Sequence, residues 1–126
     1  MSHVETIPPE RAAELIKDGA VLIDIREIYE HASESIPGAR HHALSQIDAK
    51  HPAREGDTVL IFHCKSGMRT KMNAQKLAAR AGNCDVYLLG GGIQAWKRAG
   101  LPISASAGGN NRPQGGLLSR FVSFFR

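Results

Sequence analysis

The sequence predicts an α/β domain in which a central parallel sheet is covered by helices on both faces. Three runs of strand length carry this prediction, over residues 21–25, 58–63 and 86–89. They are almost continuously apolar, as expected of strands that are buried on both faces. Helical segments separate them, and strands that alternate with helices form parallel sheets with right-handed crossovers. A chain of 126 residues has the usual size of one such domain.

Helices are expected before, between and after these strands. The pair Pro8-Pro9 is tolerated in a first helical turn, and Gly19 and Gly82 suit C-terminal caps. Glycines 90–92 form a turn before the last helix. The stretch 41–57 indicates no more than a short strand and a short helix. The expected helical segments are residues 11–17, part of 26–36, 74–81 and 93–99.

The chain divides into three parts. Residues 1–103 hold all the expected strands and helices and form the domain. Residues 104–116 contain small residues, four glycines and two asparagines, a composition typical of flexible linkers. Residues 117–126 predict an amphipathic helix, because their apolar side chains fall within one arc of about 160°. The residues of this arc are Leu117, Leu118, Phe121, Val122, Phe124 and Phe125.

Charge and cysteine content exclude several classes of protein. Residues 1–63 have a balance of −5 and residues 64–126 one of +9, which together give the net +4. Aromatic residues do not interleave with the basic ones, so we expect no nucleic-acid partner. Two cysteines cannot form a disulfide framework, and the chain shows neither a signal peptide nor a membrane span of ~20 apolar residues. We therefore expect a cytoplasmic protein.

The expected strand ends bring three features to one edge of the sheet. Asp24 and Arg26 follow the first strand, Cys64 follows the second, and glycines 90–92 follow the third. Ligands bind beyond the carboxyl ends of the strands in open parallel sheets. This edge is therefore the expected site.

Cys64 begins a loop that suits a thiolate or a bound anion. The backbone amides of residues 65–70 precede a helix, and its dipole favours negative charge there. Lys65 and Arg69 add positive charge, and Gly67 permits an unusual turn. The loop predicts a nucleophilic Cys64; the alternative is a small buried cysteine that only packs.

Other roles for the cysteines and the neighbouring histidine are disfavoured. No ligand spacing typical of a metal site is present, so no metal is expected. His63 and Cys64 would point to opposite faces of a strand, which makes His63 a poor general base and a better core residue. A helix of roughly 18 Å separates Cys64 from Cys84, whereas a disulfide needs Cα atoms within about 7 Å. Cys84 is therefore expected to be structural.

Four ordered motifs resemble the rhodanese (sulfurtransferase) domain over about residues 5–103. The motifs are Asp24-Ile25-Arg26-Glu27, Ile36-Pro37-Gly38-Ala39, Phe62-His63-Cys64-Lys65-Ser66-Gly67-Met68-Arg69-Thr70, and the run from Leu89 to Pro102 with its Gly90-Gly91-Gly92 and Trp96. The resemblance implies the rhodanese-like three-layer fold. The stretch 61–79 is particularly similar to single-domain rhodaneses with a C-terminal membrane hairpin, which is absent or was removed here. Two departures, Glu34-Ser35 for Gly-His and His41-His42-Ala43 for Asn-Ile-Pro, affect neighbouring loops and bear on substrate preference.

The resemblance implies a sulfurtransferase without a cofactor. Cys64 would take a sulfane sulfur from thiosulfate or a related anionic donor, hold it as a persulfide and pass it to a thiol or to cyanide. Arg69, together with Lys65 and Arg26, would hold the sulfonate end of the donor. Asp24 would orient the loop or Arg26, or only cap a turn. Residues that would bind the donor and the persulfide are Lys65, Ser66, Gly67, Met68, Arg69 and Thr70, whereas Trp96 and the glycine triplet would be structural.

Two alternative functions stay open. A phosphatase or arsenate reductase on the same fold needs Cys-x5-Arg, whereas Cys64 and Arg69 form the shorter Cys-x4-Arg. A non-catalytic rhodanese module that binds a partner is the other alternative, although such modules usually lack the cysteine. The tail 117–126 would also allow self-association or peripheral binding at the inner face of a membrane.

Overall fold

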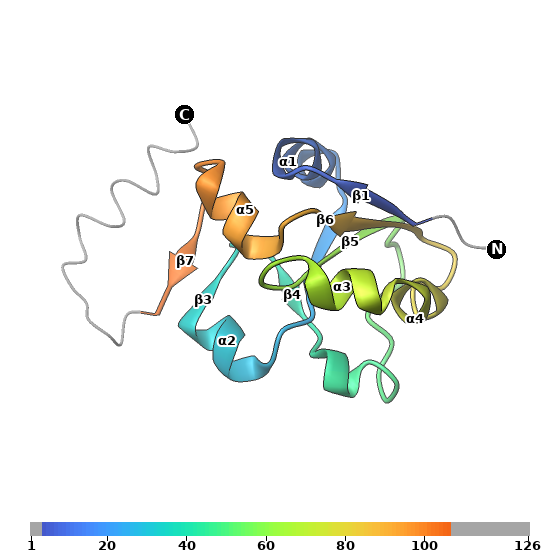
Figure 1. The fold of residues 1–126 in the computed structure, drawn as a ribbon. Coiled ribbons are helices and arrows are strands. Elements are labelled where there is room, and N and C mark those ends of the chain that lie inside the picture. The colour runs from blue at the N-terminus through green and yellow to red at the C-terminus, as the bar shows by residue number, and fades with distance from the viewer. Residues whose placement is uncertain (1–3, 107–126) are drawn as a thin grey trace.

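Five parallel strands form the central sheet of the computed structural model, which describes residues 4–106 (Figure 1). The strand order is β1-β6-β5-β2-β4, and each neighbouring pair runs parallel. The strands are β1 (Glu5–Ile7), β2 (Val21–Asp24), β4 (Arg40–His41), β5 (Val59–His63) and β6 (Asp85–Leu89). The helices are α1 (Pro9–Lys17), α2 (Ile28–Ser33), the 3-10 helix η1 (Leu44–Gln46), α3 (Met68–Met72), α4 (Ala74–Ala79) and α5 (Gly92–Arg98).

Alternate strand residues enter two apolar clusters, one on each face of the sheet. Leu22 and Ile61 join Trp96 of α5 in the first cluster. Ile23 and Phe62 join the second cluster, which also holds Leu77 of α4. Burial of both faces explains the continuously apolar strands, and the predicted α/β fold with its central parallel sheet is confirmed.

The main differences from the expected elements lie at short segments. β1 was not predicted, because three residues are too few for a periodic pattern. The helix expected over 74–81 is preceded by the separate short helix α3, and the two meet at Asn73. The polar stretch 26–36 holds α2, none of whose residues is buried, and then the short strand β3 (Glu34–Ser35).

A second, two-stranded sheet closes one side of the domain. β3 pairs antiparallel with β7 (Ser104–Ala105), and the Ser106 amide donates to the Ser33 carbonyl at 2.8 Å. The first two residues of the predicted linker are therefore a strand. The rest of the linker from residue 107 and the amphipathic tail 117–126 lie outside the described residues. None of the helices within residues 4–106 is long and apolar enough to cross a membrane.

Candidate active site

Cys64 lies directly after β5, at the carboxyl edge of the sheet, and its side chain is fully buried. The Gly67 amide donates a hydrogen bond to Cys64 Sγ at 3.1 Å. Thr70 Oγ1 lies 3.9 Å from the same sulfur and donates to the Gly67 carbonyl. The loop therefore folds back over the sulfur, with one amide donor and one hydroxyl oxygen close to it.

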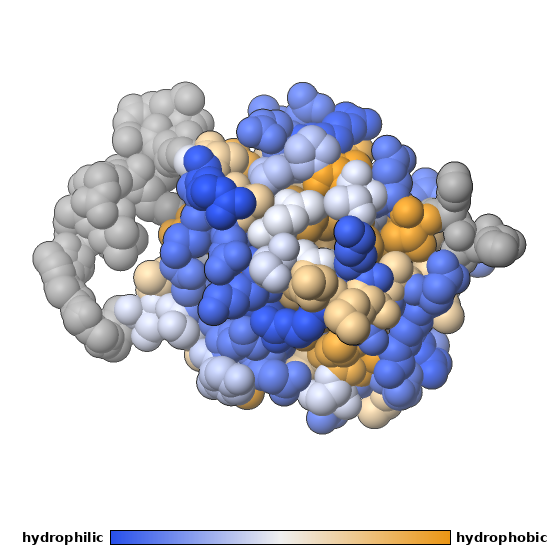
Figure 2. Space-filling view, viewed as in Figure 1, coloured by the Kyte–Doolittle hydropathy of each residue, from blue (hydrophilic) through white to orange (hydrophobic). Residues whose placement is uncertain are grey.

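The start of α5 supports this loop through backbone hydrogen bonds. The amides of Ile93 and Gln94 donate to the carbonyls of Cys64 and Lys65 at 2.9 and 3.1 Å. Gly92 permits the contact, since a Cβ there would lie 2.5 Å from each of these two carbonyl oxygens. Gly92 thus lets α5 approach the loop backbone. Figure 2, in the orientation of Figure 1, shows pale surface where α5 begins, beside a mixture of apolar and strongly hydrophilic side chains where α3 lies.

We expect Gly92→Ala to destabilise the protein by more than about 1 kcal/mol, because its Cβ would overlap loop backbone at a positive φ of 59°. Gly100→Ala is the matched control: it introduces the same residue at φ 79°, where nothing lies within 4 Å of the new Cβ. Urea unfolding of both variants measures the difference. Equal losses of stability in both variants would show that backbone strain, and not overlap with the loop carbonyls, causes the effect.

Arg69 does not point a free guanidinium at Cys64. Its two terminal nitrogens donate to the two carboxylate oxygens of Glu30 on α2, both at 2.9 Å. The hydrogen bonds from Arg69 lower the pKa of Glu30 to about 2, and the same bonds raise the pKa of Arg69. Glu30 Oε1 also accepts from the Glu27 amide at 3.0 Å, as in a helix capping box. α2 is thereby fastened to the cysteine loop.

Asp24 is the centre of a buried polar cluster beside the loop. Its carboxylate accepts two hydrogen bonds from the Arg26 side chain, at 2.9 and 3.0 Å, and one from His31 Nδ1 at 2.7 Å. His63 Nε2 lies 3.8 Å from Asp24 Oδ1. Burial acts to raise the pKa of Asp24, but the hydrogen bonds from Arg26 and His31 outweigh it and lower that pKa to about 2. Arg26 also donates to the Glu34 carbonyl at 2.5 Å.

The low pKa of Asp24 predicts a loss of stability in acid. Asp24 has a folded pKa of about 2 against an ordinary value of 3.8, so its contribution is fully present above about pH 4 and disappears as the pH falls toward 2. The loss should amount to about 2 kcal/mol. Urea unfolding at a series of pH values from about 6 to 2 should show this decline in the wild type and a flatter profile in Asp24→Asn. Parallel profiles would contradict the assignment.

His63 is fully buried, as expected of a core histidine. Its Nδ1 donates to the Cys64 carbonyl at 3.1 Å, which places the proton of the neutral ring on Nδ1. Burial lowers the pKa of His63 and favours that neutral ring. Within residues 4–106, Nε2 makes no hydrogen bond, and the Cys64 thiol contacts Gly67 and Thr70 and not the His63 ring.

The remaining expected residues are also placed. Thr70 is buried in the loop, whereas Lys65, Ser66 and Met68 are exposed on its outer side. Both cysteines are free, and Cys84 Sγ donates to the Asp57 carbonyl at 3.3 Å. Among the described residues, no group of three or more His, Cys, Asp or Glu could hold a metal ion.

Sequence reasoning missed Glu30 and His31 as parts of this site. Glu27-x-x-Glu30 has the spacing of a capping box, which points to a helix start but not to a partner 39 residues away. No local pattern relates His31 to Asp24. Both contacts arise because α2 follows β2 and passes over the carboxyl edge of the sheet, where the cysteine loop begins.

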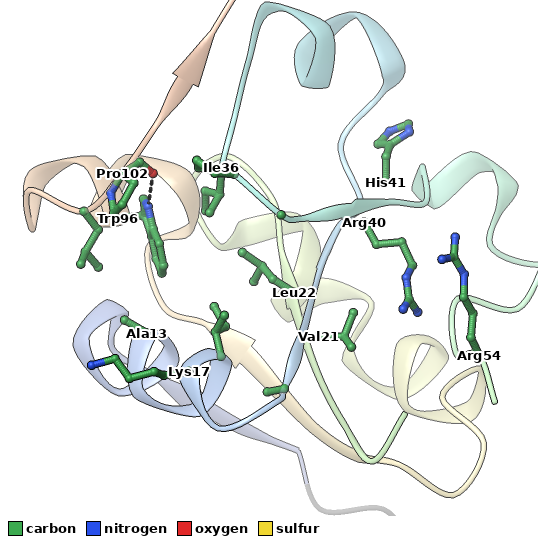
Figure 3. A pocket seen from close by; sticks show the side chains of 15 residues that line it. Ala13, Lys17, Val21, Leu22, Ile36, Arg40, His41, Arg54, Trp96 and Pro102 are labelled. Atoms are coloured by element: carbon green, nitrogen blue, oxygen red, sulfur yellow. Dashed lines mark hydrogen bonds between the residues drawn. The ribbon is translucent and has the colours of Figure 1, made fainter. Parts of the chain in front are cut away.

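Among residues 4–106, two hollows lie near the sheet, and the smaller of the two adjoins the loop. It has a volume of about 470 Å³ and is lined in part by Ser66, Gly67, Met68 and Thr70. The larger, of about 1010 Å³, lies between α1, β2 and the edge strand β4 (Figure 3). Lys17, Arg54 and Trp96, labelled in Figure 3, are among its lining residues, and none of the lining residues belongs to the cysteine loop.

Comparison with known proteins identifies the family. The model of the rhodanese-like domain matches residues 8–99. A thiosulfate sulfurtransferase GlpE of Pseudomonas fluorescens (strain SBW25) is 36% identical over 108 residues, which cover 86% of this chain and 97% of that protein. GlpE of Ectopseudomonas mendocina is 35% identical over 111 residues, with the same coverage. These relatives have almost no length outside the match, so they give no support to the expected kinship with hairpin-bearing rhodaneses.

Solved structures show the same fold. A rhodanese-related protein from Thermoplasma volcanium matches with a TM-score of 0.69 at 25% identity, over 79% of this chain and 97% of that one. A protein of Rhodopseudomonas palustris, described as a possible tyrosine phosphatase, matches with a TM-score of 0.66 at 26% identity, over 80% and 85%. The family model, the curated relatives and the fold agree, and the chain belongs to the family of rhodanese-like domains.

Proposed function

We propose that the protein is a sulfurtransferase that carries a sulfane sulfur on Cys64. One observation carries the proposal: the Gly67 amide donates to Cys64 Sγ at 3.1 Å inside a loop whose backbone is fixed by α5. A fixed amide donor stabilises a thiolate and the anionic persulfide that replaces it. The relatives named thiosulfate sulfurtransferase support the same class of reaction.

The proposed reaction has two steps, each a displacement at sulfur. The Cys64 thiolate attacks the outer sulfur of thiosulfate, a bond forms between the two sulfurs, and sulfite leaves with the electron pair of the broken S–S bond. A thiolate acceptor or cyanide then attacks the outer sulfur of the persulfide, and Cys64 leaves as a thiolate. No external oxidant or reductant is needed, and no base has to remove a proton from Cys64 once it is ionised.

The other expected residues take different parts in this proposal. Gly67 and Thr70 contact the sulfur or its loop, and the hollow beside Ser66 and Met68 offers room for the donor. Arg26 is buried against Asp24, so we do not propose that it holds the sulfonate end of the donor. Its proposed part is to support the strand end from which α2 departs.

Mass spectrometry of the intact protein tests the proposal. After incubation with thiosulfate and removal of the excess, the wild type should gain one sulfur atom, and peptide mapping should locate it on Cys64. Addition of cyanide should remove that sulfur and release thiocyanate. A protein that keeps its original mass under these conditions, with Cys64 reduced at the start, would contradict sulfur transfer.

A phosphatase is the second candidate, because one structural match is described as a possible tyrosine phosphatase. A phosphatase loop must wrap a tetrahedral oxyanion with its arginine, whereas Arg69 is held by Glu30 in a loop one residue shorter than Cys-x5-Arg. We therefore expect no hydrolysis of p-nitrophenyl phosphate. A non-catalytic binding module would show neither hydrolysis nor the gain of sulfur.

The partners and the compartment complete the proposal. We propose a small anionic donor, a thiol acceptor and a reducing cytoplasm, which would keep Cys64 and Cys84 as free thiols.

We also propose that the tail 117–126 docks on protein, its own domain or a second copy, when no membrane is present. Deletion of residues 117–126 should then change the mass measured by light scattering or lower the melting temperature. An unchanged mass and melting temperature, together with no binding of the full chain to anionic vesicles, would contradict docking.

A further inference from the structure

The carboxylate of Glu30 occupies the donors that a bound oxyanion would need. Arg69 gives one terminal nitrogen to each oxygen of Glu30, the two-bond geometry in which a guanidinium also binds a sulfonate. Glu30 is itself fixed by the Glu27 amide, and its side chain is 18% exposed against 37% for Arg69. The acidic partner is thus more firmly placed than the basic one.

The second arginine near the site, Arg26, also has its donors engaged by other groups of the protein. The side chain of Arg26 donates hydrogen bonds to the Asp24 carboxylate and to the Glu34 carbonyl. Two of the three cations that the sequence places beside Cys64 are therefore matched by a carboxylate each. Lys65 is the remaining one of these three, and it is exposed on the outer side of the loop, as is Lys71 of α3, which lines the smaller hollow. The loop offers a donor much less net positive charge than its sequence indicates.

We propose that Glu30 is a specificity-determining residue, which holds Arg69 away from the donor and so favours donors of one negative charge over the dianion thiosulfate. This inference rests on the proposed function, since it concerns the donor of that same site. The substrate class it names is an organic thiosulfonate or persulfide, whose sulfane sulfur is attached to a group of low charge.

The chemistry of the leaving group agrees with this charge balance. Attack of the Cys64 thiolate on thiosulfate breaks the S–S bond and expels sulfite, which carries two negative charges. Attack on an organic thiosulfonate breaks the same kind of bond and expels a sulfinate, and attack on an organic persulfide expels a thiolate. These groups carry a single charge at the reacting end. A site without a free arginine stabilises a singly charged leaving group more easily than a doubly charged one.

Glu30→Gln tests the inference with two donors. Glutamine keeps an oxygen for the Glu27 amide and so preserves the start of α2, but it removes the charge that holds Arg69. We expect kcat/KM for thiosulfate to rise about tenfold through a lower KM, the effect of one new charge-assisted contact. For benzenethiosulfonate, a monoanion, the change should stay below about threefold. The gain with thiosulfate should also shrink with added salt.

Two further variants separate this role from a structural one. Glu27→Gln removes the same charge from the start of α2, but the Glu27 side chain faces Ser45 and not Arg69, so thiosulfate kinetics should not change. Glu30→Gln combined with Arg69→Gln should show no gain with thiosulfate, because the released guanidinium is then missing. Thermal melting of each variant reports whether the fold is retained.

Several outcomes would overturn the inference. These are an equal change with both donors in Glu30→Gln, an unchanged or higher KM for thiosulfate, a gain that persists without Arg69, and the same gain in Glu27→Gln. An equal fall with both donors would mean that the pair only holds the loop together. Failure of the proposed function looks different, because the wild type would then transfer sulfur from neither donor.

Discussion

Replacement of Cys64 by serine should abolish sulfur transfer and leave the fold intact. Serine is close to cysteine in size and can still accept the Gly67 hydrogen bond, but its hydroxyl is not ionised at neutral pH and cannot form a persulfide. Thiocyanate release from thiosulfate and cyanide should fall to the uncatalysed level. Far-UV circular dichroism and the urea midpoint should stay close to those of the wild type.

The second cysteine supplies the control for this experiment. Cys84 lies at the opposite end of α4, donates to the Asp57 carbonyl and has a pKa raised by its burial. Cys84→Ser should therefore keep nearly full activity. Residual turnover in Cys64→Ser, or a comparable loss in Cys84→Ser, would contradict the assignment of Cys64 as the sulfur carrier.

Replacement of Asp24 by alanine should cause the largest loss of stability, about 3–5 kcal/mol. Asp24 is fully buried and Arg26 is 4% exposed, so the substitution leaves a buried guanidinium without its carboxylate. The total stability of such domains is only about 5–15 kcal/mol, and the variant would be close to unfolding at room temperature. Urea unfolding at neutral pH measures the loss.

A double variant shows whether the unpaired charge causes that loss. Asp24→Leu combined with Arg26→Met removes both charges and retains apolar volume, so it should recover most of the stability. His31 then loses its carboxylate partner as well, but its ring is partly exposed and can be solvated. A double variant as unstable as Asp24→Ala would show that the hydrogen bonds, and not the lone charge, matter most.

The sequence allowed the prediction of the sheet and of the cysteine loop because both depend on local patterns. Buried strands such as 59–63 are apolar up to their last residue, here His63, and the loop from Cys64 to Thr70 follows this strand directly. The position of Cys64 at the carboxyl edge follows from the direction of the strand alone. At residues 90–92 the sequence predicted only a turn. The contact between α5 and the loop, in which a Cβ at Gly92 would overlap two carbonyls, depends on tertiary structure.

The state of the arginines could not be predicted in the same way. A positive side chain beside a cysteine loop suggests anion binding, but its availability depends on carboxylates that lie elsewhere in the chain. Glu30 reaches Arg69 across 39 residues, and the two meet only because α2 crosses the carboxyl edge of the sheet. Short strands are a second limit: the two or three residues of β1, β3, β4 and β7 are too few to show a period.

The hydrogen bonds between the cysteine loop and α5 also determine when the site can be completed during synthesis. The loop carbonyls of Cys64 and Lys65 wait for the amides of Ile93 and Gln94, roughly thirty residues further along the chain. Domains fold as the chain leaves the ribosome, at about 5–20 residues per second. At that rate, the roughly thirty residues between the loop and α5 take seconds to be added, so the loop after Cys64 forms its contacts with α5 only after that interval. Premature termination anywhere before α5 would release a polypeptide in which the carbonyls of Cys64 and Lys65 lack these two amide donors.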